Sequence, residues 1–142
     1  MPEPDETEPW AATSVWRGGF IAGIEVRRPQ LEPGRARVWV RTDVLLLEGE
    51  PVSPTSRLVG LLDVANGMTV RADPGAVLFP NVDLTAHFFD QPRGEWLGLD
   101  VEVTFGAAGV GMTSAVLHDD DGPYGRALQI LTVRPMTAAT SG

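Results

Sequence analysis

The sequence predicts an α+β fold, in which a curved antiparallel sheet of about five to six strands wraps around one central helix. Three observations lead to this prediction. A single segment, residues 54–66, is long and apolar enough for a buried helix. Several other segments alternate between apolar and polar residues with the period of a strand, and short turns rich in Gly, Pro and Asp join them. Because only one helix is available to cover the sheet, wrapping the sheet around it buries both.

The N-terminal third is predicted to contain a leader and a hairpin. Residues 1–14 are acidic, proline-rich and without periodicity, which is typical of a disordered segment. Residues 15–28 are apolar with several glycines, and we expect a strand that bends. Residues 35–44 alternate between two faces, so they are predicted to be a second strand that pairs with the first.

The helix and four more strands account for most of the remaining chain. Ser53 is a good N-cap, Pro54 suits the first helical position, and Gly67 is a plausible stop. Four strands with short connections follow, and we expect them to form an antiparallel meander. Their expected ranges are 77–89, 95–106, 110–118 and 126–134. Residues 136–142 are predicted to be a frayed tail.

Composition excludes several classes of protein. The 142 residues suit one domain, and the formal charge of -8 argues against a general nucleic-acid binder. The chain has no cysteine and no lysine, so disulfides, thiolate nucleophiles and lysine Schiff bases are excluded. No apolar run approaches the roughly 20 residues of a membrane helix, and the acidic start does not resemble a signal peptide. We therefore expect a cytoplasmic protein without a membrane partner.

Asp63 lies in the middle of the apolar helix. At about 100° per residue, its side of the helix also carries Gly60, Gly67 and, at the edge, Asn66. These small and polar residues let backbone or a ligand approach closely. A buried carboxylate without a partner is costly, so Asp63 is either structural, held by backbone N–H groups or an arginine, or part of a site.

Other motifs give no separate function. His87 and His118 lack the spaced ligands of a zinc site, and a lone strand histidine is usually a half-exposed polar residue. No G-x-S-x-G elbow surrounds a serine. The run "HDDDG" lacks the alternating ligands and distal glutamate of an EF-hand loop, and it suits a hairpin turn better.

Three segments carry a resemblance to a known family. "LLDVANG" on the helix, "FPNVDLTAHFFDQPRGEWLGLDVE" across two strands and "DDDGPYGRALQILTVRP" near the end resemble the C-terminal half of bacterial acyl-CoA thioesterase II. They are similar above all to the thioesterase-family proteins common in actinobacteria. The similarity runs from about Arg37 to Pro135. It implies that residues 15–135 form a single hotdog domain, the fold of a curved sheet around a central helix.

The resemblance also implies a catalytic set that needs no cofactor and no metal. In this family an aspartate on the helix, a threonine or serine at a strand start and a glutamine on the last strand orient a water that hydrolyses the acyl-CoA thioester. Asp63 matches the aspartate and Gln129 matches the glutamine. Asn81 occupies the hydroxyl position, and an amide cannot reproduce the free rotation of a hydroxyl.

The residues by themselves are consistent with this set. Gln129 shares a strand face with Ala127, Leu131 and Val133, which is a poor match to a solvated face. Asn81 follows a proline at a strand start, where turn chemistry explains an asparagine equally well.

The substrate is expected to be acyl-CoA, with Gly60, Asn66, Gly67 and Arg93 as substrate-binding residues. Arg93, together with Arg126 and Arg134, is a candidate for the CoA phosphates only by position and charge. The alternative function is a non-catalytic hotdog module that binds an acyl ligand or a protein partner. A hydratase is a weaker idea, because no histidine lies where an acid–base pair is needed.

The resemblance further implies a particular assembly. The family usually carries two hotdog modules in one chain, and one is present here. We therefore expect a homodimer that replaces the internal repeat, or a separate truncated lineage. An isolated module would leave a sheet edge uncovered, which also favours a dimer.

Overall fold

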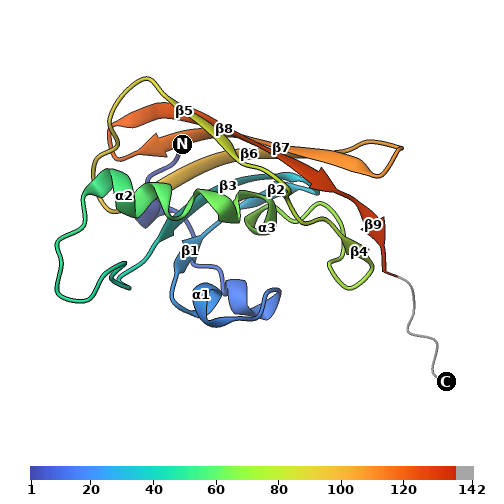
Figure 1. The fold of residues 1–142 in the computed structure, drawn as a ribbon, viewed down its shortest axis with the longest axis horizontal. Helices are drawn as coiled ribbons and strands as arrows, with labels where there is room; N and C mark the ends of the chain where they lie inside the picture. Colours follow the sequence, from blue (N-terminus) through green and yellow to red (C-terminus); the bar gives the residue numbers. More distant parts are fainter. Residues whose placement is uncertain (137–142) are drawn as a thin grey trace.

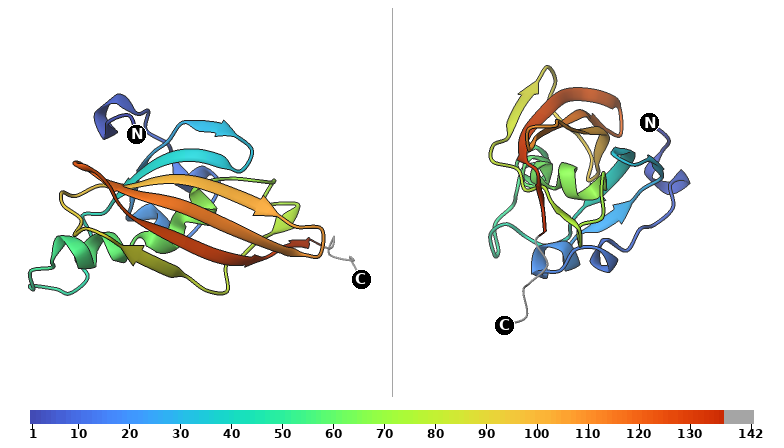
Figure 2. Two further views of the ribbon diagram at one scale, coloured as in Figure 1. Left: turned by 90° about the horizontal axis from the view of Figure 1, so that it is seen from above. Right: turned by 90° about the vertical axis from the view of Figure 1, so that its right-hand side faces the viewer.

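The computed structural model describes residues 1–136, which form a large antiparallel sheet curved around one helical segment (Figures 1 and 2). The sheet has seven strands in the order β1-β3-β6-β7-β8-β5, and β2 also pairs with β3. Its strands are β1 (Glu25–Arg27), β2 (Gln30–Glu32), β3 (Arg35–Arg41), β5 (Thr85–Phe88), β6 (Leu97–Phe105), β7 (Val110–Asp119) and β8 (Gly122–Thr132). Two short strands, β4 (Val77–Leu78) and β9 (Arg134–Pro135), pair with each other at one end of the molecule.

The helical segment spans residues 54–68 and is interrupted in the middle. It consists of α2 (Pro54–Val59), a 3-10 turn η3 (Leu62–Val64) and α3 (Ala65–Met68). As predicted, the Ser53 side chain caps α2 by accepting a hydrogen bond from the Ser56 amide at 3.1 Å. At Leu61 the backbone hydrogen bonds tighten to three-residue spacing, as in the bond that Leu61 N donates to Leu58 O. The predicted continuous helix is therefore wrong in this respect.

The core lies between the helical segment and the concave face of the sheet. Both sides contribute fully buried aliphatic side chains, as the alternation in the strands predicts. The helix contributes Leu58, Leu61, Leu62, Ala65 and Met68, and the strands contribute Ala36, Val38, Val40, Leu97, Leu99, Val101, Val103, Ala115, Leu117, Ala127 and Leu131. The right-hand view of Figure 2 looks along the helix and shows the sheet curving around it.

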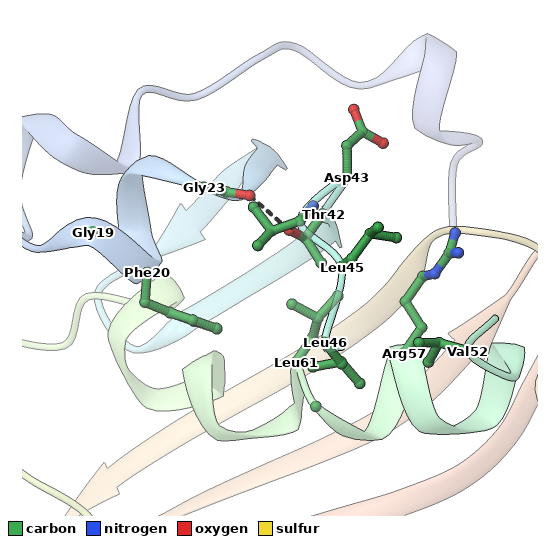
Figure 3. A pocket seen from close by; sticks show the side chains of 12 residues that line it. Gly19, Phe20, Gly23, Thr42, Asp43, Leu45, Leu46, Val52, Arg57 and Leu61 are labelled. Atoms are coloured by element: carbon green, nitrogen blue, oxygen red, sulfur yellow. Dashed lines mark hydrogen bonds between the residues drawn. The ribbon is translucent and has the colours of Figure 1, made fainter. Parts of the chain in front are cut away.

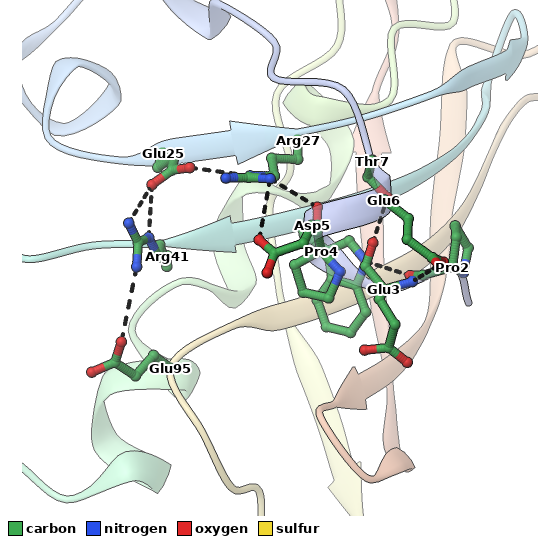
Figure 4. Close-up of polar contacts among 11 residues, drawn as sticks. Pro2, Glu3, Pro4, Asp5, Glu6, Thr7, Glu25, Arg27, Arg41 and Glu95 are labelled. Carbon is green, nitrogen blue, oxygen red and sulfur yellow. Dashed lines mark hydrogen bonds and ion pairs between the residues drawn. The ribbon is translucent and has the colours of Figure 1, made fainter.

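Residues 1–14 differ from the disordered leader that their composition predicts. They form two 3-10 turns, η1 (Pro4–Glu6) and η2 (Ala12–Ser14), and lie against the sheet. Trp39 Nε1 donates to Pro2 O at 2.9 Å, and Arg27 Nη1 donates to Pro4 O at 3.1 Å. Figure 4 shows this segment beside the ion pairs of β1 and β3. The segment is held by burying Trp39 on the outer face of the sheet, which composition alone does not reveal.

The next segment also departs from the prediction. Only residues 25–27 of the expected strand 15–28 are extended, and α1 (Gly19–Ala22) is a short helix before them. The predicted pairing is nevertheless present, because β1 runs antiparallel to β3 with Glu25 opposite Arg41. The chain thus turns through α1 before it enters the sheet, which places Phe20 beside the central helix.

The last four strands do not form a simple meander. β6, β7 and β8 are consecutive neighbours, but β5 pairs with β8 instead of β6. The expected strand 77–89 is also divided, since Pro80 interrupts it and Asn81 forms only an isolated bridge to Leu131. This crossing brings Asn81 next to β8 and hence close to Gln129.

No helix among residues 1–136 has both the length and the apolar character needed to span a membrane. Of the predicted tail, Met136 donates its amide hydrogen to Ala76 O, and residues 137–142 lie outside the described part of the chain.

Candidate active site

The structure brings Asp63, Asn81 and Gln129 together. Asp63 comes from η3, Asn81 from the segment after β4, and Gln129 from β8. Asp63 Oδ1 accepts a hydrogen bond from Asn81 Nδ2 at 2.7 Å and another from Gln129 Nε2 at 3.3 Å. Gln129 Nε2 also lies 3.3 Å from the backbone oxygen of Asp63. One carboxylate oxygen is therefore fixed by two amide donors from different elements.

Asp63 is exposed and not buried, which changes the question that the sequence raised. Asp63 lies on the exposed side of η3, while its neighbours Leu62 and Val64 are buried. The carboxylate therefore keeps contact with solvent and needs no arginine to offset burial. The two arginines considered as partners of Asp63 make other contacts: Arg57 pairs with Glu95, and Arg71 donates to Pro33 O.

Gln129 is almost completely buried on the concave face of β8, as its alternation with Ala127 and Leu131 predicts. Its amide nitrogen donates to Asp63, whereas its Oε1 has no hydrogen-bond partner in the described part of the chain. Directly across from it on β7 lies Thr113, whose buried hydroxyl also has no partner among residues 1–136. Sequence reasoning set Thr113 aside as a nucleophile, because no histidine lies in a recognisable local signature; its signal is the cross-strand position opposite Gln129.

A cavity of about 600 Å³ opens beside Asp63, and we call it the carboxylate cavity. Gly60, Asn66 and Gly67 line it, as the helical phase predicts. Its lining residues are Trp16, Arg17, Phe20, Ile21, Gly60, Asp63, Val64, Asn66, Gly67, Met68, Pro74, Val77, Leu78, Phe79, Pro80 and Asn81. A volume of this size, mostly apolar with a few polar groups, is typical of small-molecule sites.

One wall of the carboxylate cavity comes from a segment in which sequence reasoning found no functional residue. Trp16, Arg17, Phe20 and Ile21 lie around α1 in the region expected to be a bent strand. Trp16 Nε1 donates to Gly67 O at 2.7 Å and thereby holds this wall against the helix. The sequence signal for this wall was the occurrence of two aromatic residues and an arginine next to a pair of glycines.

The arginines proposed for the CoA phosphates lie elsewhere. Arg93 Nη1 lies 3.0 Å from Oδ2 of Asp121, which belongs to the turn between β7 and β8. This turn leads into the start of β8, seven residues before Gln129. Arg126 lies on the exposed face of β8, and Arg134 is exposed on β9. None of the three lines the carboxylate cavity, so position and charge along the sequence were insufficient to find the cation at this site. Arg17 is the one basic residue in the lining.

The arrangement suits activation of a water molecule. Asp63 Oδ1 is occupied by two amide donors, and no donor among residues 1–136 contacts Oδ2. That oxygen can accept a proton from a water in the cavity. Within the same described residues, no group of three His, Asp or Glu side chains is placed to hold a metal ion.

Comparisons with known proteins show the family and the fold of the chain. The family model of the acyl-CoA thioesterase C-terminal domain matches residues 2–133. No curated protein matches the chain. A hot dog fold protein of unknown function from Alicyclobacillus acidocaldarius has a TM-score of 0.68 at 15% identity, covering 96% of this chain and 54% of that one. The chain therefore has the hotdog fold that the resemblance implies.

Two further solved structures belong to the same group. A candidate thioesterase from Novosphingobium aromaticivorans is 23% identical with a TM-score of 0.66, covering 92% of this chain and 51% of that one. A candidate thioesterase II from Thermobifida fusca is 15% identical with a TM-score of 0.68, covering 94% and 53%. The present chain thus spans about half the length of each of these three structures.

Proposed function

Because the chain belongs to the acyl-CoA thioesterase C-terminal domain family, we propose that it hydrolyses an acyl-CoA thioester with a water activated by Asp63. The observation that carries the proposal is the set of hydrogen bonds on Asp63 Oδ1 from Asn81 and Gln129, beside an open cavity. Two amide donors fix the carboxylate, and Asp63 lines the cavity in which a water and a thioester can meet.

Each residue has a distinct role in the proposed reaction. Asp63 Oδ2 takes a proton from the water while the oxygen of that water forms a bond to the thioester carbonyl carbon. The carbon–sulfur bond then breaks, and the proton passes to the leaving CoA sulfur. Asn81 and Gln129 keep the carboxylate in the orientation for this transfer. Arg17, at the cavity wall, is positioned to bind a CoA phosphate in place of Arg93.

The first test measures thiol release from acyl-CoAs of several chain lengths. The Asp63→Asn variant keeps the size of the side chain but cannot accept the proton, so kcat is expected to fall about 10²–10⁴-fold. Asp90→Asn is the matched control, since Asp90 is exposed and, within residues 1–136, its Oδ1 accepts a hydrogen bond only from the neighbouring Gln91 amide. Hydrolysis that survives Asp63→Asn would contradict the proposal. Metal independence stays a prediction, which activity after EDTA treatment checks.

The alternative is a non-catalytic module that binds an acyl group or a protein partner. The observation that favours it is Asn81, whose amide occupies the position of the family's hydroxyl and donates to the carboxylate. An Asn81→Thr variant separates the two functions. Release of thiol by Asn81→Thr but not by the natural chain would indicate a binding module that has lost its hydroxyl.

We also propose that two copies pair through β5. This strand is hydrogen-bonded to β8 on one side, and no strand of residues 1–136 pairs with its other side. Phe89, which directly follows β5, is 72% exposed. An unpaired edge beside an exposed aromatic side chain supports an edge-to-edge dimer, in which the partner copy would supply a second hotdog module.

A further inference from the structure

A second cavity adjoins the carboxylate cavity and is built from a different part of the chain. It has a volume of about 380 Å³, and we call it the leucine pocket. Its lining residues are Gly19, Phe20, Gly23, Thr42, Asp43, Val44, Leu45, Leu46, Val52, Arg57, Gly60 and Leu61. Phe20 and Gly60 line both cavities, so the two spaces meet at these residues.

The leucine pocket offers almost no polar group to a ligand. The Thr42 hydroxyl is used, since it donates to Gly23 O at 2.7 Å, and Arg57 pairs with Glu95 at 3.7 Å. Figure 3 shows Phe20 pointing toward the leucines of the loop and the helix, while the Asp43 carboxylate points away from them. A ligand of this pocket would therefore have to be apolar.

The apolar loop that forms the pocket is unusually exposed. Val44 is 64% exposed, Leu45 58% and Leu46 56%. Consecutive exposed apolar side chains of this kind mark a binding surface more often than an ordinary loop. Because the two cavities share the lining residues Phe20 and Gly60, a single elongated ligand is the occupant that would use both.

We propose that the leucine pocket holds the distal part of the acyl chain whose thioester lies at Asp63. This inference rests on the proposed function, and it specifies which part of the substrate the leucine pocket would recognise. Gly60 lies one turn before Asp63 on the same side of the helix, at the boundary between the two cavities. A Cβ at Gly60 would lie 3.9 Å from Leu46 Cδ2, in ordinary contact, so a longer side chain there would enter the passage.

The consequence is a preference for chains long enough to pass Phe20 and Gly60. A short acyl group stays within the carboxylate cavity, whereas a longer one gains the contacts of Leu45, Leu46 and Leu61. Each methylene placed in an apolar pocket contributes measurably to discrimination between substrates, by about 10-fold or more. The activity is therefore expected to rise from butyryl-CoA to octanoyl-CoA and lauroyl-CoA.

The test compares variants by the ratio of kcat/KM for lauroyl-CoA to that for butyryl-CoA. Leu46→Asn makes the pocket polar and is expected to lower this ratio at least about 10-fold. Leu47→Asn is the matched control, because Leu47 is 57% exposed in the same loop but does not line the pocket. Gly60→Leu is expected to lower the ratio as well, by narrowing the passage. Circular dichroism checks that each variant is folded.

A binding experiment separates this inference from the proposed function. Calorimetry with the Asp63→Asn variant measures affinity for butyryl-CoA, octanoyl-CoA and lauroyl-CoA without turnover. Affinity that rises with chain length and is lost in Leu46→Asn supports the pocket even if the natural chain hydrolyses nothing. Affinity independent of chain length, or equal effects of Leu46→Asn and Leu47→Asn, would overturn it. Leu46→Asn could instead change the oligomeric state and leave the chain-length preference as it is. That result would also overturn the inference, because it would show that the apolar loop packs against a second copy of the chain.

Discussion

Two buried side-chain oxygens, one on a residue that contacts Asp63 and one on its cross-strand neighbour, lack hydrogen-bond partners among residues 1–136. They are Thr113 Oγ1 and Gln129 Oε1, which belong to residues directly opposite each other on β7 and β8. An unpaired buried polar group costs about 1–3 kcal/mol of stability. Their retention next to the candidate catalytic carboxylate follows the pattern that functional sites keep polar groups which a core without a function would replace.

Thr113→Val tests this cost directly. Valine has nearly the same shape and removes the unpaired hydroxyl, so the free energy of unfolding is expected to rise by about 1 kcal/mol. Urea denaturation measures the change. Thr104→Val on the exposed face of β6 is the control and is expected to change stability by less than about 0.5 kcal/mol. A clear loss of stability in Thr113→Val would mean that the hydroxyl is hydrogen-bonded.

For single residues, the sequence predicted burial correctly where the alternation of apolar and polar residues along a strand determines which side chains face the core. The buried position of Gln129 follows from the period-two pattern around it, and the structure agrees. Asp63 was harder, because the sequence left open whether it is a buried structural carboxylate, although helical phase had placed it on the side of Gly60 and Gly67; only the structure shows that it is exposed beside a cavity. Arg93 was chosen only from charge, and its position depends on tertiary contacts with Asp119 and Asp121.

At the scale of elements, β1 is held to β3 by an ion-pair network on one face of the sheet. Arg41 Nη2 lies 2.7 Å from Glu25 Oε2, and Arg27 Nε lies 3.1 Å from Glu25 Oε1 (Figure 4). The guanidinium groups of Arg27 and Arg41 both lie over the Trp96 ring, at 5.4 Å and 4.8 Å from its centre. A short strand of three residues is thereby fixed through its side chains as well as its backbone.

This network makes part of the stability depend on pH. Burial alone would raise the pKa of Glu25, but hydrogen bonds from Arg41 and Arg27 lower that pKa below its ordinary value. A lowered carboxyl pKa contributes stability above the unfolded pKa of about 4.3, and the contribution is lost as the pH falls through the folded pKa. The Glu25 pair is therefore fully effective above about pH 5.

Glu25→Gln is expected to lower the free energy of unfolding above this pH by a few tenths to about 1 kcal/mol, since the pair is partly exposed. The difference from the natural chain should shrink as the pH falls toward 3, which denaturant titrations at several pH values measure. Glu32→Gln, on the exposed strand β2, is the control. A difference that stays constant down to low pH would show that the carboxylate charge is not responsible.

The elements themselves were predictable in unequal measure. Alternation predicted β6, β7 and β8 closely, and the Ser53 cap fixed the start of α2. The pairing of β5 with β8 was missed, because local pattern gives the existence of a strand and not its neighbour. The division of the central helix begins at Gly60, which ends α2 and whose low helix propensity competes with the apolar periodicity.

At the scale of the whole molecule, the open side of β5 is the place where a second copy can extend the sheet. Phe89 N donates to Tyr124 O at 3.0 Å, and Thr85 and His87 are paired with β8 in the same register. Since hydrogen-bonding residues alternate in an antiparallel pair, the N–H groups of Ala86 and Phe88 point to the free side.

Ala86→Pro removes one of these outward N–H groups without removing a bond to β8. We expect a folded chain that sediments as a monomer, whereas the natural chain sediments as a dimer at micromolar concentration. His87→Pro is the contrasting variant, because it removes an N–H that faces β8, and it is expected to lower stability instead. A natural chain that is already monomeric would contradict the dimer.

The extent of the ordered molecule was underestimated from composition. Acidic and proline-rich residues usually mark disorder, but residues 1–14 meet the apolar surface of Trp39 and the Arg27 side chain on the outer face of the sheet. Order there depends on a surface contributed by strands that come later in the chain. The family match agrees, since it begins at residue 2.

The wall formed by Trp16, Arg17, Phe20 and Ile21 is contributed by one continuous stretch of chain. The sheet and the central helix supply the proposed reacting groups, and this stretch supplies much of the shape of both adjoining cavities. Recombination that exchanges residues 15–23 between homologues would therefore alter substrate range while leaving the chemistry in place. Under the proposed function, a library confined to these nine codons varies one shared wall of both cavities, and Asp63, Asn81 and Gln129, the residues proposed to react, lie outside it.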